Sequence, residues 1–226
     1  MKFPADRRAA DNWWHYHWLA VVVAAVAAAL VGHLIFRSVT APKADLQVAL
    51  IASKAYPDSA LDALARALTP LTADENGDGE RTVMVVQYTV NFRTDTAAST
   101  DASAQKAGVA GMLADLRGCY SQIFLLEDPD GFSRSTGALR CRDGTLPADG
   151  VYPDKAETCY RWADCPVLAG LDLGTYDSTL YGGTGSVQDL FGGLYVGSRG
   201  FWDDTATAHP EADEALWQTI TAGALG

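Results

Sequence analysis

Histidine is scarce in this sequence, and the common catalytic motifs are missing from it. The chain has 226 residues and 4 histidines, of which only His209 lies beyond the first 37 residues. Few side chains that titrate near neutral pH are therefore present for acid–base catalysis. The sequence contains no G-x-S-x-G, no H-E-x-x-H and no glycine-rich phosphate loop followed by lysine. We predict a protein that is not an enzyme, with catalysis by carboxylates alone as the remaining alternative.

Basic residues are also few, and their shortage excludes a class of partners. The chain has 17 Lys and Arg against 28 Asp and Glu, which gives a net charge of -11. An acidic surface repels nucleic acid, so we exclude DNA and RNA as partners. Apolar residues are plentiful, at 48% of the chain, and they suffice for a folded core.

One long apolar run, Trp18 to Phe36, contains no charged residue. As a helix it would span roughly 28 Å, close to the thickness of a bilayer core. We predict a transmembrane helix at 18–37 that anchors the chain in the cell membrane. The basic residues before it place residues 1–17 in the cytoplasm. Residues 38–45 are then a linker and residues 46–226 an extracytoplasmic domain; the alternative is a cleaved signal peptide.

Short apolar runs alternate with helical patterns in the first half of this domain. Continuous apolar strands indicate burial on both faces, and crossover helices indicate parallel pairing. The pattern predicts an α/β fold with three layers and a mostly parallel sheet. The residues after Asp128 show no strong periodicity, apart from a short strand and a C-terminal helix. The predicted strands are 46–52, 81–90, 122–127 and 193–196, and the predicted helices are 59–71, 103–117 and 210–222.

The order of these elements, together with the sequence IFLLEDPDG at 123–131, resembles the first lobe of bacterial extracellular solute-binding proteins. It also resembles small membrane-anchored relatives of these proteins in Gram-positive bacteria. The resemblance covers roughly residues 46–146 and implies a single lobe, because the chain has no room for a second. It implies binding of a solute or a partner, without the closure of two lobes around a ligand.

In a sheet of this kind, ligands bind outside the carboxyl ends of the strands. The residues at those ends that we predict to bind a ligand are Ser53, Tyr56, Asn91, Asp128 and Asp130. The alternative is that all five are loop and cap residues without a ligand.

The turn DENGDGE at 74–80 matches part of a calcium-binding loop. Asp74, Asn76 and Asp78 occupy the first, third and fifth positions, and Gly79 occupies the sixth. The twelfth position is Val85, where such a loop needs a carboxylate. The two interpretations are a weak calcium site, with calcium as the only candidate cofactor, and a polar turn without metal.

Four cysteines, Cys119, Cys141, Cys159 and Cys165, lie in the predicted extracytoplasmic domain. An even number in that compartment favours two disulfides. Three pairings are open, and we predict Cys159 with Cys165 and Cys119 with Cys141. The spacings match no zinc motif.

Two functions remain open at the level of sequence. The first is a membrane-anchored accessory protein that binds a solute or a partner, beside a membrane complex. The second is a structural or assembly component of a cell-envelope complex that binds no small molecule. A concave pocket lined by Tyr56, Asn91 and Asp128 would favour the first.

Overall fold

The structure, a computed structural model of the whole chain, describes residues 18, 22, 23, 44–93, 102–200 and 209–225. Contacts divide the chain into two units, residues 1–43 and 44–226, and the fold below is that of the second unit. Of the predicted span 18–37, only Trp18, Val22 and Val23 belong to the described residues. In the described part of the chain, no helix is both long enough and apolar enough to cross a membrane.

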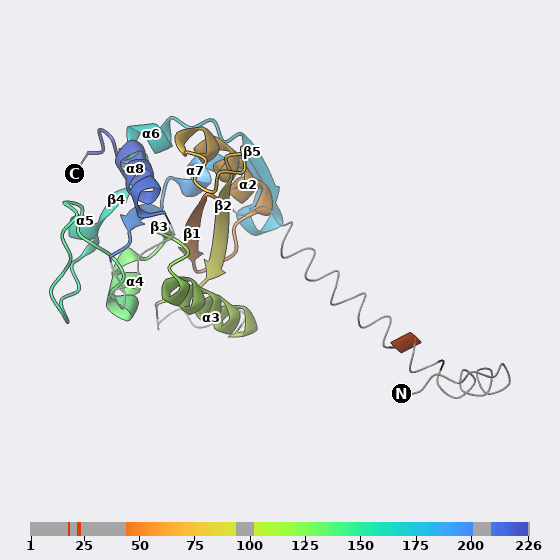
Figure 1. Cartoon of the computed structure of the whole chain (residues 1–226), viewed down its shortest axis with the longest axis horizontal. Coiled ribbons are helices and arrows are strands. Elements are labelled where there is room, and N and C mark those ends of the chain that lie inside the picture. The colour runs from red at the N-terminus through yellow and green to blue at the C-terminus, as the bar shows by residue number, and fades with distance from the viewer. Residues whose placement is uncertain (1–17, 19–21, 24–43, 94–101, 201–208, 226) are drawn as a thin grey trace, which may run out of the picture. The chain divides into compact units, whose positions relative to one another are not determined.

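The second unit is a mixed α/β domain with a mostly parallel sheet of five strands, in the order β2-β1-β3-β7-β4. Figure 1 shows helices on both sides of this sheet, with α3 and α4 on one side and α2, α6 and α8 on the other. The strands of the sheet are β1 (Leu46–Ala52), β2 (Val83–Thr89), β3 (Ile123–Leu126), β4 (Cys159–Arg161) and β7 (Tyr195–Ser198). The helices are α2 (Asp58–Leu68), α3 (Ala102–Gly118), α4 (Pro129–Thr136), α5 (Lys155–Thr158), α6 (Pro166–Ala169), α7 (Val187–Phe191) and α8 (Pro210–Ile220).

The strand β1 is central to the first half of the sheet. It pairs in parallel with β2 over its whole length, from Leu46 beside Val83 to Ala52 beside Thr89. It also pairs in parallel with β3, from Val48 beside Ile123. All three strands and the helices between them were predicted from the sequence, and the structure confirms their ends within about two residues, with one exception. The first predicted helix was expected to end at residue 71, but residues 69–71 form a 3₁₀ turn (Thr69–Leu71).

Alternate residues of the buried strands supply two separate cores, because successive side chains point to opposite faces of a sheet. On β1, Val48 and Leu50 belong to one core, while Ala49 and Ile51 belong to the other. The first core contains α2, α7 and α8, and the second contains side chains from α3 and α4. Both faces of the sheet are thus covered, which explains why β1 and β3 read as continuous apolar runs.

The second half of the domain departs from the simple parallel order. The strand β7 lies between β3 and β4 and runs antiparallel to both. It begins at Tyr195, two residues later than predicted. The glycine-rich segment after Tyr181 contains strand β6 (Gly183–Ser186), which is not among the strands predicted from the sequence. This strand pairs with β5 (Thr175–Ser178) in a separate antiparallel hairpin. A 3₁₀ turn (Thr179–Tyr181) lies between the two strands of the hairpin.

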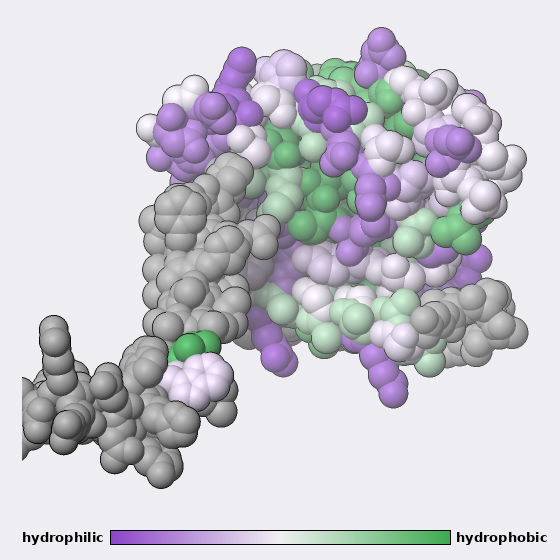
Figure 2. All heavy atoms as spheres, turned by 90° about the vertical axis from the view of Figure 1, so that its right-hand side faces the viewer, coloured by the Kyte–Doolittle hydropathy of each residue, from purple (hydrophilic) through white to green (hydrophobic). Residues whose placement is uncertain are grey.

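The described surface of the second unit has both polar and apolar side chains. On the face drawn in Figure 2, hydrophilic residues dominate the described surface, and apolar side chains lie between them. Large apolar side chains that are more than half exposed include Leu146, Val151, Tyr152 and Leu180. The first three of these belong to one segment between α4 and α5.

Candidate functional site

A cavity lies at the carboxyl ends of the three parallel strands β1, β2 and β3. Its volume is about 430 Å³. The chain reaches it directly after each strand, because parallel strands all end at the same edge of a sheet. The residues that line it are Ile51, Ser53, Lys54, Val90, Asn91, Phe92, Arg93, Glu127, Asp128 and Leu180.

Three of the five residues that the sequence predicted as ligand contacts come together in this cavity. These are Ser53 after β1, Asn91 after β2 and Asp128 after β3. Tyr56 is not among the lining residues, because its side chain is buried in the first core and stacks on Phe191, with ring centroids 5.7 Å apart. The predicted pocket residues therefore form a cavity without Tyr56.

The fifth predicted residue, Asp130, lines a different and smaller cavity of about 200 Å³. Its Oδ1 accepts a hydrogen bond from the backbone N–H of Lys155, 2.9 Å away. This bond fixes the segment before α5 against α4. Asp130 lies in the first turn of α4, two residues after Asp128, the N-cap residue that lines the larger cavity.

The sequence reasoning missed three charged residues of the larger cavity, Lys54, Arg93 and Glu127. Lys54 and Glu127 are each adjacent in sequence to a predicted residue, and Arg93 lies two residues after Asn91. Because all three lie at the ends of the parallel strands, their position in the sequence could have predicted them. Glu127 also has a structural role. Its Oε2 accepts a hydrogen bond of 2.5 Å from the backbone N–H of Ser53, which ties the end of β3 to the end of β1.

Asp128 and Asn91 are held in place by local hydrogen bonds. The Oδ1 of Asp128 accepts from the backbone N–H of Gly131, 2.9 Å away, and so caps α4, whose first residue is Pro129. The backbone of Asn91 is bound on both sides by one glutamine: its N–H donates to Gln105 Oε1 and its carbonyl accepts from Gln105 Nε2. Both residues are therefore fixed to neighbouring helices by hydrogen bonds.

Aromatic side chains lie behind the charged rim. The Lys54 ammonium lies 4.4 Å from the ring centroid of Tyr181, whose ring also contacts that of Tyr56 at 5.5 Å. Burial raises the pKa of Tyr181 to about 12, and the negative charge of Glu127 contributes. The phenol of Tyr181 therefore stays protonated at neutral pH. Its hydroxyl is buried and has no hydrogen-bond partner among the described residues.

The acidic turn at 74–80 is held by its own side chains and by Asp45. Asp74 accepts from the backbone N–H groups of Gly77 and Gly79, and Asn76 and Asp78 each accept from the residue two positions on. Such bonds are typical of polar turns. In the part of the chain that the structure describes, no three His, Cys, Asp or Glu side chains lie close enough to hold a metal ion. The calcium interpretation stays a prediction.

Asp45 anchors this turn to the start of β1. Its carboxylate is buried and accepts from the backbone N–H groups of Thr82, Asn76 and Glu75, at 2.7, 3.0 and 2.9 Å. Burial alone would raise the pKa of Asp45, but the three backbone hydrogen bonds outweigh it, and the pKa is lowered. The ionised form is therefore the one that stabilises the fold.

Acid should weaken this anchor. A carboxylate whose pKa is lower in the folded state stabilises the fold above its unfolded pKa of about 4, and this stabilisation is lost as the pH falls through the folded pKa. We expect urea unfolding at pH 6 and pH 3 to show a smaller loss of stability on acidification for Asp45→Asn than for the wild type. Exposed Asp62 is the matched control, and Asp62→Asn should behave as the wild type. Equal acid sensitivity of the wild type and Asp45→Asn would contradict this role.

All four cysteines are free thiols in the structure, so neither predicted disulfide is formed. Cys159 and Cys165 are separated by the sheet: Cys159 belongs to the second core and Cys165 to the first. Burial raises the pKa of the Cys165 thiol to about 11 and that of the Cys159 thiol to about 12. The short sequence distance between these two cysteines suggested a pair, but the strand and the turn between them direct the two side chains to opposite faces.

Comparisons with known proteins give no relative for this arrangement: no family model, no curated protein and no solved structure matches the chain. The fold and the cavity define the molecule only as an α/β domain with a polar cavity at the carboxyl ends of its parallel strands. The resemblance to solute-binding proteins remains an expectation from the sequence.

Proposed function

We propose that this protein is a membrane-anchored extracytoplasmic accessory protein that binds a small polar solute and performs no catalysis. The solute would occupy the cavity between Ser53, Asn91 and Asp128. The predicted helix at 18–37 would hold the domain at the membrane, and a solute-binding-like single lobe would present the cavity to the outside. The observation that carries the proposal is the cavity itself, at the position where open α/β sheets bind their ligands.

The charges of the cavity indicate the kind of solute. Lys54 and Arg93 are positive, while Glu127 and Asp128 are negative, so the rim has groups of both signs within an otherwise acidic domain. Phe92 and Leu180 add apolar surface. A zwitterionic solute such as an amino acid or a short peptide can pair with both signs, whereas a neutral sugar can only form hydrogen bonds. The volume of about 430 Å³ suits a molecule of that size.

Thermal unfolding of the full-length chain in a mild detergent tests this proposal. A ligand that binds only the folded state at 100 times its Kd stabilises it by about 2.7 kcal/mol. For a domain of this size we expect Tm to rise by roughly 5–10 °C with amino acids or dipeptides, but not with neutral sugars. Arg93→Ala should reduce the rise at the same ligand concentration.

The matched control for Arg93→Ala is Arg66→Ala, because Arg66 is also exposed and does not line the cavity. It should leave the ligand-induced rise unchanged. A rise that Arg93→Ala and Arg66→Ala preserve equally would place the ligand elsewhere. If no compound changes Tm, the binding proposal fails.

A Tm that no compound changes would favour the alternative function, a structural or assembly component of a cell-envelope complex. The observation in its favour is the exposure of Leu146, Val151 and Tyr152, at 53%, 54% and 52%, on one segment of the surface. Apolar side chains gathered on a surface are typical of a contact with another protein.

A further inference from the structure

The segment that contains Cys141 and the strand that contains Cys159 lie along the same edge of β7. Leu139 forms an isolated antiparallel bridge with Arg199, and the backbone N–H of Arg140 donates to the carbonyl of Ser198, 3.1 Å away. The next residue of β7, Gly197, is paired with Cys159 of β4. The segment at Leu139 and Arg140 therefore stops pairing with β7 after Arg140, and β4 pairs with β7 from the next position onward.

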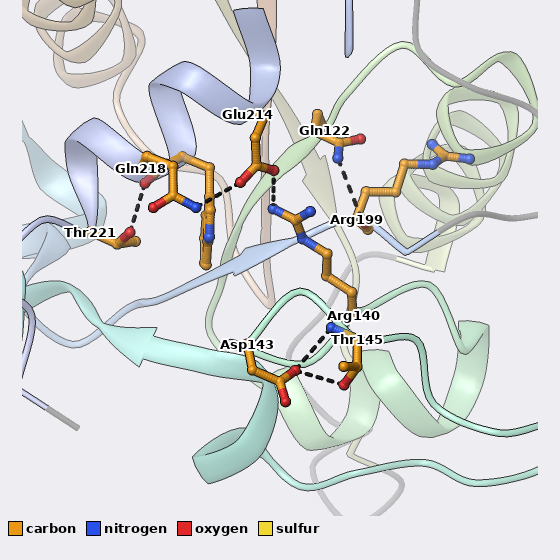
Figure 3. Close-up of polar contacts among 9 residues, drawn as sticks. Gln122, Arg140, Asp143, Thr145, Arg199, Glu214, Gln218 and Thr221 are labelled. Carbon is orange, nitrogen blue, oxygen red and sulfur yellow. Dashed lines mark hydrogen bonds and ion pairs between the residues drawn. The ribbon is translucent and has the colours of Figure 1, made fainter. Parts of the chain in front are cut away.

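The side chains of this segment alternate between the two faces of the sheet. Figure 3 shows Arg140 directed toward α8, where it forms an ion pair of 2.5 Å with Glu214. Leu139 lies on the other face and belongs to the second core, together with Cys159. A Cβ atom on Gly197 would lie 2.9 Å from Leu139 Cδ2 and 3.0 Å from Cys159 Sγ, so these two side chains cover the same glycine. In an extended segment, Cys141 shares the face of Leu139 and hence that of Cys159.

The residues that follow the two cysteines are in contact on the opposite face. The Arg142 guanidinium lies 4.8 Å from the ring centroid of Tyr160. The backbone N–H of Arg142 donates to the carbonyl of Glu157, 2.8 Å away. Along the edge of β7, Arg140 lies beside Ser198 and Cys159 lies beside Gly197, the next residue of that strand, so Cys141 follows Arg140 at the place that Cys159 occupies. A disulfide requires Cα atoms about 4.4–6.8 Å apart, a range that includes the spacing of about 5 Å between neighbouring chain segments in a sheet.

From this juxtaposition we propose that Cys141 and Cys159 form a disulfide when the domain is exposed to an oxidising environment. The bond would close the loop 142–158, whose first part has little regular structure. That loop contributes Tyr152, Pro153 and Asp154 to the smaller cavity beside α4. The disulfide would hold this wall of the cavity, and the exposed apolar segment, against β4.

The other two thiols are engaged elsewhere. Cys119 Sγ accepts a hydrogen bond of 3.0 Å from Arg199 Nη2 and donates to the carbonyl of Leu116. Cys165 lies in the first core, on the far side of the sheet from Cys159. The structure thus favours the pairing of Cys141 with Cys159 over both pairs predicted from the sequence.

The oxidation proceeds by exchange with an external disulfide, such as oxidised glutathione or a protein disulfide donor. The Cys141 thiolate attacks one sulfur of that disulfide, forms a mixed disulfide and releases one thiolate. Cys159 then loses its proton and attacks the Cys141 sulfur, which releases the second thiolate. Two protein thiols are oxidised, and one external disulfide is reduced to two thiols. Cys141 reacts first because it is only partly buried, whereas Cys159 is buried and its pKa is raised to about 12.

Peptide mapping of the full-length chain tests the proposal directly. The chain is purified in a mild detergent with oxidised glutathione, unfolded in an alkylating agent and digested with trypsin without reduction. Cleavage after Arg117, Arg134, Arg140, Arg142, Lys155 and Arg161 places each cysteine on a separate peptide. We expect a peptide that joins Cys141 to Cys159, together with alkylated Cys119 and Cys165. A link between Cys159 and Cys165 or between Cys119 and Cys141 would overturn the proposal, as would four alkylated cysteines.

Two variants provide a second measurement. Cys119→Ser combined with Cys165→Ser should retain the link, so thiol titration of the unfolded protein should find no free thiol. Cys141→Ser should lower Tm by roughly 5–15 °C relative to the wild type, and a reducing agent should abolish the difference. Cys119→Ser is the single-residue control, and its Tm should respond to the reducing agent as that of the wild type does. If the Tm of the wild type is the same with and without the reducing agent, the link does not exist.

Discussion

Replacing Asp115 by alanine should lower the free energy of unfolding by about 3–5 kcal/mol, because it breaks a buried polar network. Asp115 is 2% exposed on α3, and it accepts four hydrogen bonds. The donors are the amide of Gln47 at 2.8 Å, the hydroxyl of Tyr88 at 2.9 Å, and the backbone N–H and hydroxyl of Ser121 at 3.0 and 2.7 Å. The Asp115 carboxylate on α3 is thus hydrogen-bonded to β1, to β2 and to the turn that follows α3.

Of these donors, the amide of Gln47 keeps a hydrogen bond to the hydroxyl of Ser121, 2.9 Å away, once the carboxylate is removed. Burial raises the pKa of Tyr88, and the charge of Asp115 raises it further, so the phenol stays a proton donor at all moderate pH values. The alanine variant would leave the hydroxyl of Tyr88 without its acceptor. In a domain of this size the loss corresponds to a fall in Tm of roughly 10–15 °C, measurable by circular dichroism in urea or on heating.

Two comparisons separate this network from the general cost of losing an acidic residue. Asp115→Asn keeps the shape and one oxygen acceptor, so it should cost less than Asp115→Ala. Asp62→Ala removes an exposed carboxylate from α2 and should change stability by no more than about 0.5 kcal/mol. An Asp115→Ala variant as stable as Asp62→Ala would show that the network contributes nothing.

Gly108→Ala should also destabilise the domain, by about 2–3 kcal/mol, although alanine is the better helix former. Gly108 is buried on α3 at the point where this helix crosses β2. A Cβ atom there would lie 2.1 Å from the carbonyl oxygen of Thr89 and 2.8 Å from its carbonyl carbon. Backbone atoms cannot rotate away as a side chain can, so α3 would have to move from the sheet.

Gly111, one turn further along α3, provides the matched control. A Cβ atom there would meet only the ring of Tyr88, at 2.9 and 3.0 Å, and that ring is only partly buried. Both substitutions gain the same helix propensity, about 1 kcal/mol. Gly108→Ala should therefore unfold at a lower urea concentration than Gly111→Ala. The reverse order would mean that α3 does not pack on β2 through Gly108.

These contacts show where reasoning from the sequence succeeded. The strands 46–52 and 122–127 were predicted because a strand buried on both faces needs a continuous apolar run, and the strand 81–90 was predicted because it is rich in valine, tyrosine and threonine. The carboxyl ends of these strands then had to meet, which correctly grouped Ser53, Asn91 and Asp128 around one cavity. The missed residues Lys54, Arg93 and Glu127 line the same cavity, because they follow the same strand ends.

The second half of the domain resisted prediction for a physical reason. Strands β4, β5 and β6 have only three or four residues each, and Gly183 and Gly185 of β6 have no apolar side chain to produce a pattern. Their position depends on partners far along the chain, such as β7 for β4. In this structure Cys159 and Cys165 are free thiols in different cores, because a separation of six residues does not determine on which face of the sheet a side chain lies.

The sequence alone determined the class of the fold, the first three strands with their helices and the apolar run at residues 18–36, because these depend on local periodicity and hydrophobicity. It also determined that the domain is acidic, which depends only on composition. The tertiary structure decided the antiparallel insertion of β7, the burial of Tyr56, the separation of Asp130 from the larger cavity and the placement of Cys159 and Cys165 in different cores. Each of these depends on contacts between segments distant in sequence, and no local pattern of residues encodes them.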